Sequence, residues 1–144
     1  MYSLPEKIKG QCDEETYNRW LYRRAASLRK RDKKHSVSNL YSLKEYRDKV
    51  HEAVLNDADV DAYTGERMNW SLISTFDNSQ AREGGKQYRK TFANMPTVDH
   101  DIDGKGMLRF RICSWRTNDS KNDLTVNELK TFCIKVLQYQ EKHT

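Results

Sequence analysis

An acidic residue and a histidine stand side by side in the middle of this chain, at Asp99-His100, and Asn118-x-x-Lys121 follows. A hard divalent cation such as Mg²⁺ prefers oxygen ligands and keeps several waters, so the Asp99 carboxylate and the Asn118 carboxamide are candidate metal ligands. The His100 imidazole, with an unperturbed pKa of about 6.5, accepts a proton from water near neutral pH. Grouped around one point, these side chains would suit phosphodiester hydrolysis, in which water must lose a proton and the phosphate charge must be neutralised.

Two short β-like runs carry these residues. Pro96 to Val98 leads into the Asp-His pair, and Phe110 to Ser114 leads into the helical segment that holds Asn118. Successive side chains of a strand point to opposite faces, so the first strand must end at the Asp-His pair if both side chains are to face one point. The following segment contains two glycines, Gly104 and Gly106, and predicts the turn that re-aims His100.

Helical patterns flank this unit. An N-cap at Asp13 predicts an amphipathic helix to about Lys34, whose buried face holds Tyr17, Trp20, Leu21, Ala25 and Leu28. Capping boxes at Ser42/Glu45 and Thr125/Glu128 predict a helix over about 43–56 and a last helix. The last helix is expected to bury a stripe at Val126, Leu129, Phe132, Cys133, Val136 and Leu137. Residues 77–90, with two adjacent glycines, are expected to form a loop with a helical piece.

The positive charge is concentrated at the N-terminal end. The chain has 26 Lys and Arg against 21 Asp and Glu, a net charge of +5. Residues 1–50 contain 13 Lys and Arg and 7 Asp and Glu, whereas the remainder contains 13 and 14, so the whole excess lies before residue 51. This asymmetry is typical of proteins that bind a polyanion, and a solvated helix surface would explain it equally well. The candidate contacts to nucleic-acid phosphates are Arg23, Arg29, Lys30, Lys33, Lys34 and Lys121.

Length and composition fit one α+β, helix-rich domain with a modest core. The chain has 144 residues, of which 36% are hydrophobic and 33% charged. No apolar run approaches the roughly 20 residues that cross a membrane, and the N-terminal residues lack a secretory signal, so a cytoplasmic protein without a membrane partner is expected. The three cysteines are widely spaced and form no C-x-x-C pair, which indicates free thiols and no structural zinc.

The Asp99-His100 pair and the Asn118-x-x-Lys121 step after a β-like segment resemble the ββα-metal core of HNH endonucleases. Tyr63-Thr64-Gly65-Glu66 also resembles the segment that opens many HNH domains, and the resemblance covers roughly residues 61–139. It implies a helical basic arm over residues 1–56, packed on an HNH-like nuclease domain over residues 57–144. It further implies metal-dependent cleavage of DNA, with Asp99 and Asn118 as ligands of Mg²⁺, Mn²⁺ or another divalent cation and His100 as the general base.

Two departures from the family pattern affect this interpretation. The central Asn of the family, which orients the catalytic His, falls at Arg109, so Arg109 and Asp103 are the candidates to orient His100 instead. The paired cysteines that bind structural zinc in many members are also missing. The fold must then depend on the packing of aromatic and aliphatic side chains.

Two other functions fit the same residues. One is a catalytically inactive HNH-fold protein that binds nucleic acid, and the other is a protein-interaction module whose basic helix binds an acidic partner. DNA is the expected polyanion, with RNA as an alternative, and a protein partner or a second copy of the chain is also compatible with the sequence.

Overall fold

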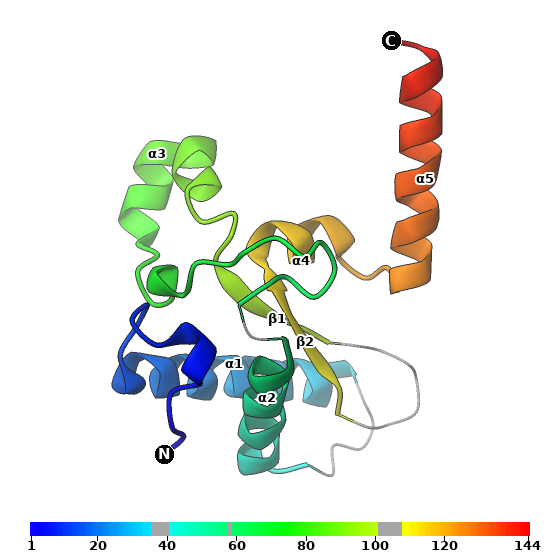
Figure 1. Cartoon of the computed structure of the whole chain (residues 1–144). Coiled ribbons are helices and arrows are strands. Elements are labelled where there is room, and N and C mark those ends of the chain that lie inside the picture. The colour runs from blue at the N-terminus through cyan, green and yellow to red at the C-terminus, as the bar shows by residue number, and fades with distance from the viewer. Residues whose placement is uncertain (36–40, 58, 101–107) are drawn as a thin grey trace.

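The computed structural model describes residues 1–35, 41–57, 59–100 and 108–144. The helices are α1 (Glu14–His35), α2 (Leu43–Asp57), α3 (Asn78–Lys90), α4 (Trp115–Lys121) and α5 (Val126–Lys142), with short 3₁₀ turns at Glu6–Ile8 and Trp70–Leu72. Strands β1 (Pro96–His100) and β2 (Phe110–Ser114) form a two-stranded antiparallel sheet near the centre of the described chain (Figure 1). The helix-rich α+β class expected from the sequence is confirmed.

The predicted helix starts are found where the capping residues place them. Asp13 accepts a hydrogen bond from the backbone N–H of Thr16 at 2.7 Å, just before α1. Ser42 and Glu45 bond reciprocally at the start of α2, and Thr125 and Glu128 do the same at the start of α5. Each pair satisfies backbone donors that have no partner inside the helix, which is why such short patterns locate helix ends well.

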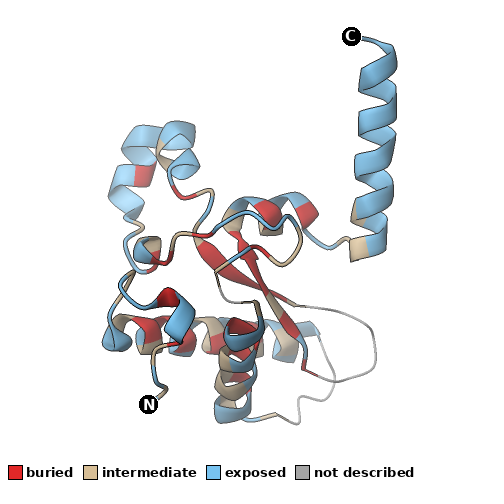
Figure 2. Ribbon diagram, in the orientation of Figure 1, coloured by how far each residue is buried: buried red, intermediate tan, exposed pale blue. Residues whose placement is uncertain are grey.

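A single hydrophobic core joins the N-terminal helices to the sheet. The register pairs Asp99 with Arg111 and His100 with Phe110, so the two residues of the Asp-His pair leave opposite faces of β1. The face that holds Val98 and Phe110 packs with the predicted buried stripe of α1 and with α2 in one cluster (Figure 2). The basic arm is therefore part of the body that carries the sheet.

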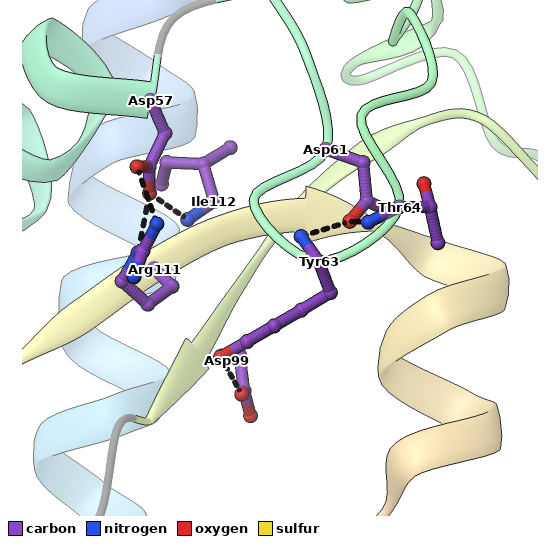
Figure 3. A network of polar contacts seen from close by, with 7 residues as sticks. All are labelled: Asp57, Asp61, Tyr63, Thr64, Asp99, Arg111 and Ile112. Carbon is purple, nitrogen blue, oxygen red and sulfur yellow. Dashed lines mark hydrogen bonds and ion pairs between the residues drawn. The ribbon is translucent and has the colours of Figure 1, made fainter. Parts of the chain in front are cut away.

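The end of α2 is tied to β2 by a carboxylate. Asp57 accepts hydrogen bonds from Arg111 Nε at 3.2 Å and Nη2 at 3.1 Å, and from the backbone N–H of Ile112 at 2.8 Å (Figure 3). A two-oxygen contact of this kind fixes orientation as well as distance. It holds β2 against the helical layer that carries α1.

The segment 77–90, expected to be a loop with a helical piece, is helical over Asn78–Lys90. Asp77 caps it by accepting from the backbone N–H groups of Ser79 and Gln80. Gly85 breaks the helical geometry with a φ of 54°, a value that glycine adopts without steric cost. Gly84 lies inside the helix, where an added Cβ would come within 2.8 Å of the Tyr88 Cβ. The glycines therefore kink α3 and permit close packing within it.

The last helix has no buried residue, which corrects the expectation of a buried stripe, although Val126 and Leu129 at its start are half-buried. No residue of α5 is buried, and Phe132 and Leu137 are each 59% exposed. Figure 2 shows the helix extending away from the sheet and from α1 to α4. The apolar periodicity identified one face of the helix correctly, but it carries no information about what covers that face. None of the helices within the described residues is long and apolar enough to cross a lipid bilayer.

Candidate functional site

Three predicted site residues line one cavity at the end of the β1–β2–α4 unit. Asp99 and His100 are the last two residues of β1, and Asn118 lies on α4. All three border a cavity of about 440 Å³, together with Arg31, Lys121 and residues 122–126. The sequence expected the first strand to end at this pair so that both side chains face one point, but β1 continues through His100, which pairs with Phe110, and the two side chains leave opposite faces. The proposed turn after it falls on residues 101–107, which lie outside the described residues.

Helix α4 begins directly after β2, and this brings Asn118 to the cavity. Ser114 is its N-cap and accepts from the backbone N–H of Thr117 at 3.1 Å. The N–H groups of Trp115 and Arg116 donate to the carbonyl oxygens of Met95 and Ala93, at 2.8 Å and 3.0 Å. These bonds hold the first turn of α4 beside the start of β1, so Asn118 and Lys121 lie over the β1 face that carries Asp99.

Asp99 is buried and held by two donors. Tyr63 Oη donates to Asp99 Oδ2 at 2.6 Å (Figure 3), and Lys121 Nζ lies 3.0 Å from the same oxygen. The side chains of Lys121 and Asp99 are only 6% and 7% exposed. Lys121 was expected to reach a phosphate from the surface, but here its ammonium group is the counter-ion of the candidate metal ligand. Both donors use Oδ2.

Tyr63 reaches Asp99 from a turn that a second carboxylate organises. Asp61 Oδ1 accepts from the backbone N–H groups of Tyr63 at 2.8 Å and Thr64 at 3.1 Å (Figure 3), and Oδ2 accepts from Ser114 N–H at 2.9 Å. Burial opposes the charge of Asp61, but the hydrogen bonds from Ser114, Thr117, Tyr63 and Thr64 outweigh it and lower its pKa. Asp61 therefore links the turn to the junction of β2 and α4.

His100 is fixed from the opposite side of β1. Its Nε2 lies 3.1 Å from Asp32 Oδ2 on α1, and the same oxygen accepts from Tyr46 Oη on α2 at 2.6 Å. The Phe110 ring meets the imidazole edge to face, with centroids 5.3 Å apart. His100 Nδ1 is buried and has no hydrogen-bond partner among the described residues. One imidazole nitrogen is thus in hydrogen-bond contact with Asp32, and the other has no partner among the described residues.

The predicted basic contacts of α1 are distributed around the helix. Lys30, Lys33 and Lys34 are exposed. Arg23 bonds to the Ser74 hydroxyl group, and Arg29 Nε donates to the carbonyl oxygen of Tyr41 at 3.3 Å. Arg31, which the sequence analysis did not select, lines the cavity. The basic face of α1 therefore adjoins the cavity through Arg31.

The structure shows one hydrogen-bonding partner of His100 within the described residues, and it is neither of the two candidates expected from the sequence. Arg109 is exposed, and Asp103 lies outside the described residues. The hydrogen-bonding partner is Asp32, 68 residues earlier in the chain. Asp32, Tyr63 and Arg31 are the cavity or support residues that the sequence analysis missed.

The chemistry of the donors suits a hard cation. Within the described ranges, no group of three or more His, Cys, Asp or Glu side chains is placed to hold a metal ion. A divalent cation at this cavity would therefore use the Asp99 carboxylate and the Asn118 carboxamide, with water at its other positions, which is usual for Mg²⁺.

Comparisons with models of protein families, with curated proteins and with solved structures found no match to this chain.

Proposed function

We propose that this protein is a metal-dependent HNH-type endonuclease that hydrolyses phosphodiester bonds in DNA. The observation that carries the proposal is the convergence of Asp99, His100 and Asn118 on one cavity. Asp99 and His100 come from the end of β1 and Asn118 from α4, and β2 lies between them in the chain, which is the β–β–α order that the family resemblance implies.

Each side chain has a defined task in this proposal. Asp99 and Asn118 hold the divalent cation through oxygen atoms, and Tyr63 and Lys121 keep the Asp99 carboxylate oriented. In this proposal His100 accepts a proton from the attacking water, and its Nδ1 is a buried nitrogen without a partner among the described residues. When bound, the cation would neutralise charge on the scissile phosphate and stabilise the leaving oxygen.

Two groups of basic residues near the cavity favour a polyanionic substrate. Arg31 lies at the cavity, and exposed lysines continue along α1. A second depression of about 280 Å³ lies between α3 and α4 and is bordered by Lys86, Arg89, Lys90 and Arg116. Asp119 borders both hollows, so the two basic regions meet at α4. A DNA backbone that crosses α4 would meet positive charge on both sides of the reacting centre.

One observation favours a second candidate, an inactive HNH-fold protein that binds nucleic acid. The buried ammonium group of Lys121 already compensates the charge of Asp99, so the fold does not require a cation at this carboxylate. The third possibility from the sequence, a protein-interaction module with an acidic partner, gains no specific support from the contacts.

A plasmid-cleavage assay tests the proposal. Supercoiled DNA is incubated with the parent protein and Mg²⁺, with and without a chelator, and with two histidine variants. We expect cation-dependent cleavage that His100→Ala lowers by about 10²–10⁴-fold, the usual contribution of a general base. His143→Ala is the matched control, because His143 is exposed beyond α5. Cation-dependent DNA binding without cleavage would favour the inactive alternative, and equal cleavage by the parent and His100→Ala would refute His100 as the base.

A further inference from the structure

We propose that Asp32 is the positioning residue for His100, and that Tyr46 holds Asp32 in place. The inference rests on the proposed function for its catalytic consequence, whereas the contacts themselves do not depend on it. Asp32 belongs to α1, Tyr46 to α2 and His100 to β1, so three separate elements meet at one carboxylate oxygen.

The direction of the hydrogen bonds selects one tautomer of the imidazole. Asp32 Oδ2 accepts from Tyr46 Oη at 2.6 Å and lies 3.1 Å from His100 Nε2. An ionised carboxylate only accepts hydrogen bonds, so the hydrogen of the second contact must be on Nε2. A neutral imidazole with hydrogen on Nε2 has its lone pair on Nδ1. Nδ1 is thus the nitrogen left to take a proton, and it is the buried nitrogen without a partner among the described residues.

The neighbouring side chains hold the His100 imidazole in one orientation. The Phe110 ring packs edge to face on the imidazole, and Tyr46 packs beside Phe110 with centroids 6.0 Å apart. Tyr46 is 1% exposed and therefore has little freedom to move. The other tautomer, with hydrogen on Nδ1, would bring the lone pair of Nε2 against the Asp32 carboxylate, an arrangement in which neither atom can donate. The carboxylate and the two aromatic rings together fix both the plane and the tautomer of His100.

Asp32 replaces the Asn that orients the histidine in the family and that is Arg109 in this chain. The resemblance assigns the orientation of the histidine to an Asn from the loop between the strands, and this chain has Arg109 there. Here a carboxylate from α1 orients the imidazole instead. The same helix carries Arg31 at the cavity, so DNA contact and the position of the base depend on one rigid element.

Nuclear magnetic resonance of the imidazole nitrogens tests the positioning without reference to activity. In ¹⁵N-labelled protein, at a pH where the spectrum shows the neutral imidazole, we expect His100 to carry its hydrogen on Nε2. His100→Ala identifies the signal. Asp32→Ala should abolish the single tautomer, whereas Asp32→Asn, which keeps an acceptor oxygen, should preserve it. Hydrogen on Nδ1 in the parent protein, or an unchanged spectrum in Asp32→Ala, would overturn the proposal.

Cleavage kinetics test the consequence. Asp32→Ala should lower kcat by about 10–100-fold, the usual effect of removing a hydrogen-bonding partner behind a functional histidine, with KM for DNA unchanged. Asp32→Asn should recover most of the rate, and Tyr46→Phe should lower kcat less than Asp32→Ala. Asp48→Ala is the matched control, because Asp48 also accepts from a tyrosine, Tyr2, but does not line the cavity. Its rate should equal that of the parent.

A double-mutant comparison separates positioning from general damage to the fold. A residue that acts only through His100 has no effect once His100 is absent. Asp32→Ala should therefore lower kcat in the parent and leave kcat unchanged in the His100→Ala background. Equal losses in both backgrounds would refute the positioning role. If the parent cleaves no DNA, the proposed endonuclease function fails, and the tautomer measurement still decides whether Asp32 positions His100.

Discussion

Replacing Lys121 by methionine should show whether the Asp99 carboxylate, which pairs with the Lys121 ammonium group, also binds a divalent cation. Methionine keeps the length of the side chain and removes its charge. The side chains of both partners are at most 7% exposed, so the variant leaves a buried carboxylate with Tyr63 as its remaining donor. Removal of one partner from a buried ion pair costs about 3–5 kcal/mol. Because Tyr63 still donates, we expect about 3 kcal/mol, which lowers Tm by about 10 °C at roughly 3 °C per kcal/mol for a chain of this size.

A divalent cation should restore part of this loss if it binds Asp99. A ligand at one hundred times its Kd stabilises the folded state by about 2.7 kcal/mol. In the parent, the ammonium of Lys121 repels a cation at Asp99, so Mg²⁺ should raise the parent Tm by less than it raises that of Lys121→Met. The measurement is thermal unfolding across a Mg²⁺ series, with a chelator as the zero point.

Two further variants make the comparison decisive. Lys130→Met removes the same charge from the exposed helix α5 and should leave both Tm and its Mg²⁺ dependence unchanged. The double variant Asp99→Asn with Lys121→Met removes both charges, so it should be more stable than Lys121→Met and indifferent to Mg²⁺. An identical Mg²⁺ response in the parent, the single variant and the double variant would refute cation binding at Asp99.

Three other predictions concern the support of the site, the basic helix and the exposed helix. Asp61→Asn should lower Tm at neutral pH, because the pKa of Asp61 is lowered in the folded state. The difference in Tm from the parent should shrink as pH falls below the unfolded pKa of about 3.9. A difference that does not change with pH would show that the charge of Asp61 does not stabilise the fold. Neutralising Lys30, Lys33 and Lys34 of α1 should flatten the slope of log K for duplex DNA binding against log salt by up to about 2.7 units. Neutralising Lys130, Lys135 and Lys142 of α5 should leave this slope unchanged. Leu21→Ala should cost about 2–5 kcal/mol in denaturant unfolding because Leu21 is fully buried, and Leu137→Ala, at 59% exposure, about 0.5 kcal/mol or less.

Features set by neighbouring residues were predictable from the sequence. The caps at Asp13, Ser42 and Thr125 act over three residues, so the helix starts follow from local chemistry. The cavity residues of β1 and α4 are also close in sequence, and a strand–strand–helix unit leaves few ways to arrange them. Lys121 follows Asn118 by one helical turn, so the spacing placed both on one face of α4, but the ion pair of Lys121 with Asp99 was not expected from the sequence.

Features that depend on what an element packs against were not predictable in this way. The glycines of α3 indicated a loop because their intrinsic preference is against helix, but the Asp77 cap and the close approach of Tyr88 favour helix at that place. The apolar stripe of α5 has the right period, yet the described chain places nothing over it. Periodicity defines a face, and burial of that face depends on tertiary structure.

The role of Asp32 was only partly predictable from the sequence. Its contact with His100 spans 68 residues, and no local rule predicts how α1 docks on β1. The sequence nevertheless distinguishes Asp32, because it follows Leu28 by four residues and so continues the buried stripe of Leu21, Ala25 and Leu28. A carboxylate on the buried side of an amphipathic helix is costly unless another group satisfies it. Because Asp32 lies within a run of basic residues, it could be taken for an acidic residue that only interrupts the positive charge. The buried stripe favours instead a donor from the body of the protein, and Tyr46 and His100 are the donors observed within the described residues.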